Sequence, residues 1–453
     1  MNAFNDFMEK HFVPVAAKIG SQKHLVAIRD AFIGIMPVTM AGSIAVLLNV
    51  FFRDLPAAWA GYAVAAGNQG LADVFTNFAN FMLPIVGING NVWWGSIAIL
   101  ALVFVFSLGY NISKAYDVNP LAGGLVAFAS LITTIPQMAT FDATISGVTE
   151  TVAGWGYLPW GYTQVTGLFS ALIVGFITSM IYVTLMKKKV GIKLPDSVPP
   201  AVSGAFAAII PGLVAIYVAA TASYLVTTYT GQTINDLIQT YIQTPLLGLS
   251  QGLGSVIIIT ILVQLFWFFG LHGTNVLAPV LDGIYKTALL ENNAAFSSGT
   301  AVSDLQYIWT RGSFDAFAWM GGAGCSLALI VAIFIFSKRE DQRAVAKMSA
   351  PMGVFNINEP VVFGLPLVLN PIYIIPFIFV PVILVVIAYL ATAIGLVPPV
   401  FVEVPWVMPP VIYAFLATGG SPMAALLALV NFVIGTVLWA PFVMLANKVK
   451  MED

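Results

Sequence analysis

The stretch PIYIIPFIFVPVILVVIAYLATAIGL, residues 371–396, contains no charged side chain and decides the class of fold. A helix needs about 20 consecutive apolar residues to cross the hydrocarbon core of a bilayer, and this stretch is long enough. The strands of a membrane barrel would instead alternate apolar and polar residues over about ten positions. The continuous run therefore predicts a membrane-spanning helix.

The rest of the chain repeats this pattern. Hydrophobic residues make up 59% of the 453 residues and charged residues only 8%, whereas a soluble domain has about 25% charged residues. Further apolar runs predict spans at residues 31–52, 93–110, 121–139, 165–186, 202–226, 255–270, 314–337 and 423–445. A tenth is expected at 399–417, although Glu403 and four prolines interrupt it. We therefore expect an all-α polytopic membrane protein with about ten transmembrane helices.

Basic residues predict the orientation, because cytoplasmic loops collect Lys and Arg. The 18 Lys and Arg residues lie before the first run or beside alternate ends of the later runs, with three exceptions. The exceptions are Arg53, Lys286 and Arg311. Both termini are therefore predicted to be cytoplasmic, with residues 1–30 as a cytoplasmic amphipathic arm.

The chain divides at a basic loop, residues 187–200, into two unlike halves. Residues 31–230 hold long, clean spans and are predicted to form a scaffold and dimer interface. In residues 231–453, predicted to be the substrate-binding transport domain, Gly, Pro, Asn, His and Glu break the apolar runs. Two broken segments stand out: FWFFGLHGTNVLAP (266–279) and PMGVFNINEPVVFGLPLVLNP (351–371). Interrupted segments of this kind indicate transporter binding sites, because non-helical backbone at membrane depth must be covered by protein or line a wet cavity.

Each broken segment holds an ionisable residue, and such residues within a membrane are functional by default. His272 could orient a sugar hydroxyl; the alternative is a histidine satisfied by a nearby carbonyl. Glu359, directly before Pro360, could accept a proton. The alternative for Glu359 is a carboxylate that caps a helix.

Three further side chains are candidate sugar ligands. The Asn358 amide suits hydroxyl recognition, and turn formation is its alternative. Asn91, close to Asn89 in the sequence, could bind sugar or belong to an extracellular turn. Trp406 could stack on the apolar face of a sugar ring, or it could be an interfacial tryptophan. The sequence leaves Asp282, Lys286 and Arg311 as either ion-pair partners or loop charges.

Missing motifs narrow the class of function. The sequence has no G-x-x-x-x-G-K-[ST] phosphate loop and no His/Cys metal spacing, so we expect no cofactor and no metal. It has neither an Arg-rich voltage-sensing helix nor a TVGYG filter, which argues against a channel. The net charge of −2 gives no reason to expect a nucleic-acid partner. A proton-coupled sugar symporter would also use an intramembrane Glu and His, and it remains the alternative.

Four motifs carry a family likeness. They are IKLPDSVPP (192–200), AIIPG (208–212), WFFGLHG (267–273) and VFNINEPVVFGLP (354–366). Together they resemble the membrane subunit of sugar phosphotransferase systems, enzyme IIC of the lactose, cellobiose and diacetylchitobiose group. The likeness runs the whole chain.

The resemblance implies a homodimer in the bacterial plasma membrane, with re-entrant hairpins in the C-terminal half. It implies a phosphoenolpyruvate-dependent system in which the chain imports a β-linked disaccharide of the cellobiose, diacetylchitobiose or lactose type. The chain would be the membrane subunit of a protein-phosphohistidine sugar phosphotransferase, surrounded by membrane lipids. The phosphoryl donor would be a phosphocysteine on the cytoplasmic protein IIB, which IIA supplies. Because the sequence stops at Asp453, we expect IIB and IIA to be separate polypeptides.

The same resemblance assigns roles to the candidate residues. His272 and Glu359 match the family's essential histidine and glutamate, which both bind sugar and take part in its phosphorylation. Asn91 and Trp406 match positions that line its sugar pocket.

Overall fold

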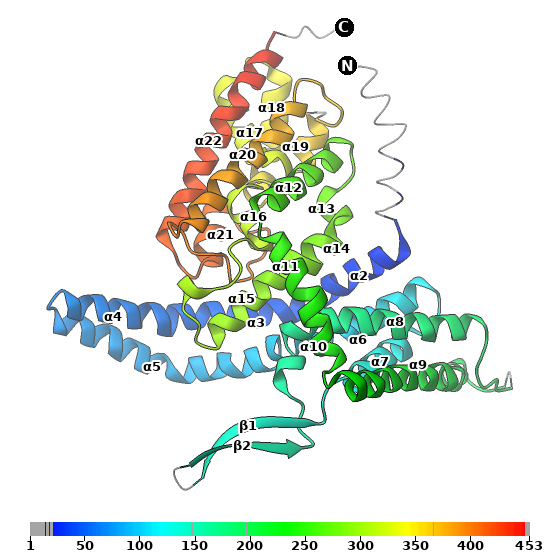
Figure 1. Ribbon diagram of the computed structural model, residues 1–453. Coiled ribbons are helices and arrows are strands. Elements are labelled where there is room, and N and C mark those ends of the chain that lie inside the picture. The colour runs from blue at the N-terminus through cyan, green and yellow to red at the C-terminus, as the bar shows by residue number, and fades with distance from the viewer. Residues whose placement is uncertain are drawn as a thin grey trace. The chain divides into compact units, whose positions relative to one another are not determined.

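The computed structural model describes residues 14, 18, 21–145, 148–195, 197–365 and 367–448 (Figure 1). Most of the predicted N-terminal arm, residues 1–30, lies outside the described residues, and its last part belongs to helix α2 (Lys23–Gly34). The chain groups into two compact units. Among the described residues, one comprises Gln22–Thr39 and Trp94–Leu247, and the other comprises mainly Met40–Trp93 and residues 248–448. The predicted division of roles at residue 230 stays a prediction.

The unit that contains Trp94–Leu247 is a helical bundle with a β-hairpin. Its helices are α2, α6 (Leu100–Ala115), α7 (Pro120–Ile132), α8 (Leu168–Lys187), α9 (Pro200–Thr230) and α10 (Ile234–Ile238). Helices α6 and α7 approach closely through small residues: a Cβ added to Gly109 would lie 2.6 Å from the Gly123 carbonyl oxygen. Such small-residue contacts are typical of helices that pack in membranes.

The hairpin consists of strands β1 (Met138–Ile145) and β2 (Val148–Trp155), paired antiparallel with Met138 opposite Trp155. It corrects two predictions. The fold is not purely α-helical, and the span expected at 121–139 ends early, because α7 stops at Ile132 and the chain then turns into the hairpin.

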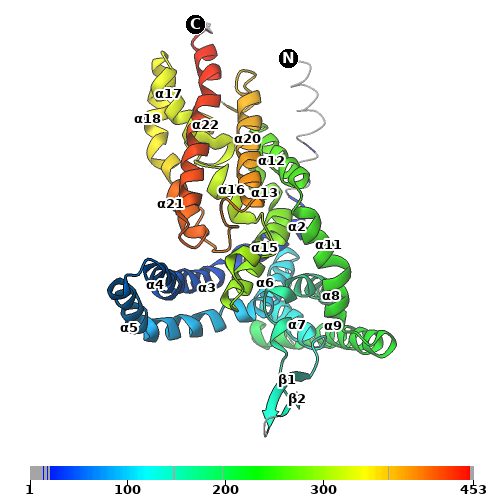
Figure 2. The ribbon, with the colours of Figure 1, turned by 60° about the vertical axis from the view of Figure 1, so that its left-hand side comes forward.

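The other unit holds both broken segments of the sequence. Its elements are α3 (Met36–Asn49), α4 (Leu55–Ala65), α5 (Gln69–Trp94), α11 (Thr244–Ser250), α12 (Leu253–Phe268), α13 (Gly273–Val276), α14 (Ala278–Val280), the π-helical turn η6 (Leu281–Lys286), α15 (Thr287–Ser297), α16 (Arg311–Phe317), α17 (Ser326–Phe336), α18 (Glu340–Val354), α19 (Glu359–Gly364), α20 (Ile374–Ala393), α21 (Pro410–Ala417) and α22 (Pro422–Ala446). The boundary between the units divides α3 after Thr39 and α11 after Leu247, and the last residue of α5, Trp94, belongs to the first unit. Helices α17, α20 and α22 pack side by side (Figure 2).

The helical polytopic class is confirmed, and the figure of about ten transmembrane helices stays a prediction. Among the described residues, six helices are long and apolar enough to cross a membrane. They are Met36–Ala65, Gln69–Ala115, Val165–Lys187, Pro200–Thr230, Ile374–Ala393 and Pro422–Ala446. A seventh candidate is the pair Ile234–Ser250 and Leu253–Phe268, bent by 76° as in a broken span or re-entrant loop.

Two other expected spans are interrupted. The run 314–337 is divided between α16 and α17, because Gly321, Gly322 and Gly324 adopt positive φ angles between the two helices. The run 399–417 contains only the short helix α21, preceded by irregular backbone.

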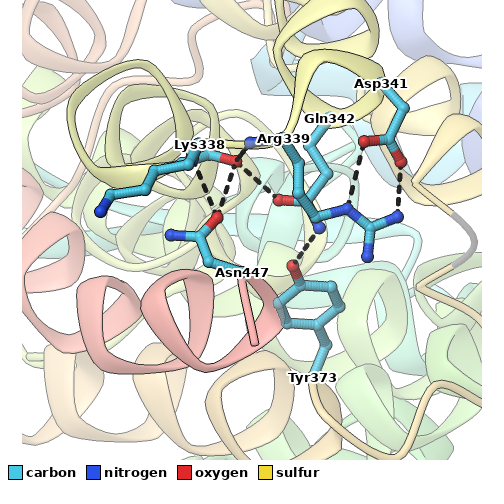
Figure 3. Close-up of polar contacts among 7 residues, drawn as sticks. Lys338, Arg339, Asp341, Gln342, Tyr373 and Asn447 are labelled. Carbon is cyan, nitrogen blue, oxygen red and sulfur yellow. Dashed lines mark hydrogen bonds and ion pairs between the residues drawn. The ribbon is translucent and has the colours of Figure 1, made fainter. Parts of the chain in front are cut away.

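The buried amide of Gln342 and the half-buried amide of Asn447 join the ends of α17, α18, α20 and α22 (Figure 3). Asn447 donates from Nδ2 to the Phe336 carbonyl (3.0 Å) and accepts at Oδ1 from the Lys338 N–H (2.9 Å). Gln342 donates from Nε2 to the Tyr373 hydroxyl (3.0 Å). The basic residues that follow α17 therefore lie at an end of this unit where side-chain hydrogen bonds join the helices.

Candidate functional site

The structure connects the two broken segments through their backbones. After α12 the chain turns at Gly270, with φ of 78°, and His272 then forms the N-cap of α13. The N–H of Leu369, which follows α19, donates to the carbonyl of Phe268 at 3.0 Å. A backbone hydrogen bond therefore joins the segment that carries His272 to the segment that carries Glu359.

The His272 side chain is held by its own helix start and by an aromatic neighbour. Its Nδ1 accepts from the N–H of Asn275 (3.3 Å) and lies 3.0 Å from the Thr274 hydroxyl. Its ring centroid is 4.4 Å from that of the buried Trp267. Because Nδ1 accepts a backbone hydrogen bond, the neutral ring carries its proton at Nε2 and can donate from that atom. The exposed imidazole thus has one defined donor.

Glu359 is the first residue of α19, and its side chain is exposed. Asn358, rather than Glu359, is the N-cap residue; its carbonyl accepts from the N–H groups of Val361 and Val362. The Asn358 side chain is only 4% exposed, and its Nδ2 has no hydrogen-bond partner among the described residues. A buried amide donor without a partner is costly, which fits a site that receives a hydroxyl oxygen.

Asn356 is a residue that the sequence analysis did not single out. It adopts a left-handed conformation, φ of 61°, which asparagine tolerates better than most residues. Its Oδ1 accepts from the Gly321 N–H (2.7 Å), and its Nδ2 donates to the carbonyls of Trp406 (2.6 Å) and Met408 (2.9 Å). One buried side chain therefore ties the NINEP segment to the glycine turn and to the Trp406 loop. The left-handed backbone conformation that orients this amide cannot be predicted from a hydropathy pattern.

Gln264 makes a second link to the glycine turn, from the helix that precedes His272. This fully buried residue of α12 accepts at Oε1 from the Gly324 N–H (2.7 Å). A Cβ added to Gly322 would lie 2.7 Å from Cγ of Asn358, so glycine permits the close approach there. The same glycine turn therefore contacts the helix that precedes His272 and the residue that precedes Glu359.

Trp406 is 49% exposed, in a loop that an ion pair fixes. Lys286 Nζ lies 2.8 Å from Glu403 Oε1, with the two side chains only 8% and 13% exposed. Arg311 pairs with Asp315 at 2.6 Å. The sequence left Lys286 and Arg311 undecided, and the structure makes both of them ion-pair partners.

The amides in α5 are placed differently from the turn that the sequence also allowed. Both Asn89 and Asn91 lie within α5. Asn89 is buried and donates to Asn49 Oδ1 at 2.8 Å, whereas Asn91 is exposed. The described contacts do not bring Asn91 to His272 or Glu359, and its role in sugar binding stays a prediction.

Comparison with known proteins identifies the family to which the chain belongs. The chain matches the family described as "Phosphotransferase system, EIIC" over residues 29–381. The chain belongs to this EIIC family. It is a multi-pass sugar permease of the cellobiose, chitobiose and lactose group, and one component of a phosphotransferase system that also contains IIB.

Individual relatives of this EIIC chain span nearly its full length. It is 43% identical to the "PTS system cellobiose-specific EIIC component" of Lactococcus lactis subsp. lactis, with both chains covered completely. It is 34% identical to the "PTS system oligo-beta-mannoside-specific EIIC component" of Bacillus subtilis, covering 98% of this chain and 94% of that one. The solved transporter ChbC, the IIC component of an N,N'-diacetylchitobiose-specific phosphotransferase system, superimposes with a TM-score of 0.85. It shares 31% identity over 98% of each chain.

Replacement of Asn356 by glycine is expected to weaken sugar binding and to destabilise the fold by about 1–3 kcal/mol, because the Gly321 N–H and two carbonyls lose their partner. Glycine keeps the left-handed backbone, so the lost hydrogen bonds are isolated from strain. Equilibrium binding of labelled cellobiose and thermal unfolding in detergent measure the two effects. Asn447→Ala removes an amide that directly follows α22 and makes no contact with this framework, so it should lower stability alone. Equal sugar affinities in the two variants would show that Asn356 does not position Trp406.

Proposed function

We propose that this EIIC protein imports a β-linked disaccharide, of the cellobiose, diacetylchitobiose or lactose type, across a bacterial plasma membrane and presents it for phosphorylation. The single observation that carries the proposal is the connected framework that joins the His272 turn, the Asn358–Glu359 segment and the Trp406 loop. Relatives named for cellobiose and for N,N'-diacetylchitobiose support the substrate class. The protein acts as a homodimer with both termini in the cytoplasm.

The proposed site binds the sugar through four side chains of the framework. Trp406 offers its exposed ring to the apolar face of a pyranose. The Asn358 Nδ2 donor and the His272 Nε2 donor bind hydroxyl oxygens. Glu359 accepts a hydroxyl proton. Asn91 contributes a further ligand from α5.

The proposed reaction transfers a phosphoryl group from a phosphocysteine of separate, cytoplasmic IIB, which IIA has supplied. Glu359 accepts the proton of the sugar's C6 hydroxyl while that oxygen attacks phosphorus and the phosphorus–sulfur bond breaks, leaving a cysteine thiolate on IIB. His272 holds the attacking oxygen in line. Such a transfer depends mainly on positioning and on charge stabilisation. The product gains about −1.5 to −2 charges at neutral pH. Once Glu359 has passed the proton to solvent, its carboxylate repels the product and favours release.

With both termini in the cytoplasm, the basic loops also face the cytoplasm, and IIB binds against them. Lys187–Lys189 at the end of α8 and Lys338–Lys347 after α17 carry most of these charges. Helix ends that are braced by Asn447 and Gln342 give IIB a fixed surface.

Sugar phosphorylation in membrane vesicles tests the proposal. Vesicles are supplied with labelled disaccharide, phosphoenolpyruvate and the soluble phosphotransferase proteins, with and without IIB. We expect labelled sugar phosphate only when phosphorylated IIB is present, and no loss when the proton gradient is collapsed. Accumulation of unmodified sugar that stops with the gradient would instead establish the symporter. Cellobiose, diacetylchitobiose and lactose as competitors identify the preferred substrate.

A further inference from the structure

Helices α2 and α8 form an apolar groove within the unit that contains Trp94–Leu247. The groove has a volume of about 590 Å³. Its walls are Leu25 and Ile28 of α2 and Leu172, Ile173, Phe176 and Ile177 of α8. Gln22 and His24 are its polar lining residues, and both lie at the start of α2. Sugar hydroxyls would find few partners here, so the groove differs in chemistry from the proposed sugar site.

The polar end of the groove is basic. His24 Nε2 lies 2.6 Å from the Tyr116 hydroxyl, and the His24 ring packs edge-on against Phe176. The ring of Tyr116 also has two ammonium groups near it: Lys23 Nζ at 5.4 Å and Lys187 Nζ at 5.1 Å from its centroid. Two lysines from different helices therefore converge beside one end of an apolar groove.

Neither lysine is held in an ion pair with a carboxylate among the described residues. The ion pairs among those residues are Arg29–Asp30, Arg53–Asp54, Lys286–Glu403, Arg311–Asp315 and Arg339–Asp341. Lys188 and Lys189 follow directly in the sequence and add to the positive potential. An anion placed between Lys23 and Lys187 would relieve their mutual repulsion.

We propose that this groove binds an anionic phospholipid, with one acyl chain between α2 and α8 and its phosphate between Lys23 and Lys187. Lys187 ends the apolar span Val165–Lys187, so the two lysines lie where a phospholipid headgroup meets the hydrocarbon. Basic pockets between membrane helices bind anionic headgroups in this way, with about 1 kcal/mol per basic residue near the surface. The combination of an apolar wall with uncompensated charge at one end favours a lipid over an apolar protein segment.

Native mass spectrometry of the full chain in detergent, with added phosphatidylglycerol or phosphatidylcholine, tests the charge requirement. The unmodified chain should retain phosphatidylglycerol preferentially and unfold at a higher temperature with it. The Lys23→Gln/Lys187→Gln double variant should lose roughly 20–30-fold in affinity for phosphatidylglycerol. A Lys193→Gln/Lys347→Gln variant makes the same change in net charge elsewhere and should bind as the unmodified chain does. Equal binding of the two lipids, or equal losses in the two double variants, would refute the site.

An Ile173→Trp variant tests the acyl-chain requirement, because the larger side chain fills the groove and leaves both lysines in place. It should weaken phosphatidylglycerol binding without changing the affinity for inorganic phosphate. If inorganic phosphate raises the unfolding temperature as phosphatidylglycerol does, and Ile173→Trp has no effect, the lysines bind free phosphate and the proposal is wrong. If Ile173→Trp changes the oligomeric state but not lipid binding, a second copy of the chain occupies the groove. Far-ultraviolet circular dichroism shows whether each variant is folded, and binding of labelled cellobiose, which uses none of these residues, keeps the lipid site separate from the proposed function.

Discussion

Glu359→Gln is expected to lower the rate of sugar phosphorylation by about 10²- to 10⁴-fold, the range that a positioned general base contributes. Glutamine keeps the size of the side chain and its hydrogen-bonding capacity but cannot accept the hydroxyl proton. Because Asn358 holds the N-cap position, the variant leaves the cap of α19 in place. The affinity for sugar should therefore change far less than the rate.

Two measurements separate the effects. Equilibrium binding of labelled cellobiose gives the affinity, and a single turnover with phosphorylated IIB gives the rate of transfer. Glu150→Gln on β2 removes an equally exposed carboxylate from the other unit, and it should leave both quantities unchanged. Full transfer by Glu359→Gln would show that another group takes the proton. A loss of binding as large as the loss of rate would make Glu359 a sugar ligand only.

Hydropathy predicted several long helices well, but it missed most of α5 (Gln69–Trp94) and predicted the interruptions poorly. The expected spans at 165–186, 202–226 and 423–445 differ from the helices by only a few residues. The run 314–337 looks continuous to hydropathy because glycine and alanine are compatible with an apolar helix. In the structure three of its glycines have positive φ, and the helix is broken there.

Only some side chains of the candidate site could be predicted from the sequence. The sequence identifies His272 and Glu359 because an ionisable group within a membrane has a high free-energy cost and therefore indicates a functional role. Asn356 and Gln264 are neutral and carry no such cost signal. Their importance lies in which backbone groups they reach, and those partners lie 35 to 60 residues away in the sequence. Only the folded backbone shows that they connect the His272 and Glu359 segments.

The buried pair of Lys286 and Glu403 leads to the second large prediction. Lys286→Met should destabilise the folded protein by about 3–5 kcal/mol, because it leaves the Glu403 carboxylate buried without its cation. Asp282 on the same π-helical turn and Asp315 on α16 add negative charge nearby, with Arg311 as the remaining cation. The double variant Lys286→Met/Glu403→Gln should recover much of this loss, since both charges are then gone. Unfolding in mixed micelles of increasing dodecyl sulfate content measures all three stabilities.

Arg53→Met is the matched control, because it breaks an ion pair of similar length, 2.6 Å, whose side chains are 46% and 30% exposed. An exposed pair contributes about 0–1 kcal/mol, so this variant should unfold almost as the unmodified protein does. Glu403 and Trp406 lie in one loop, which Lys286 holds at Glu403 and Asn356 holds at the Trp406 carbonyl. Lys286→Met should therefore weaken cellobiose binding even at temperatures where the protein stays folded. Unchanged sugar affinity in a folded Lys286→Met protein would mean that Asn356 alone positions the tryptophan, and that the ion pair stabilises the fold without shaping the site.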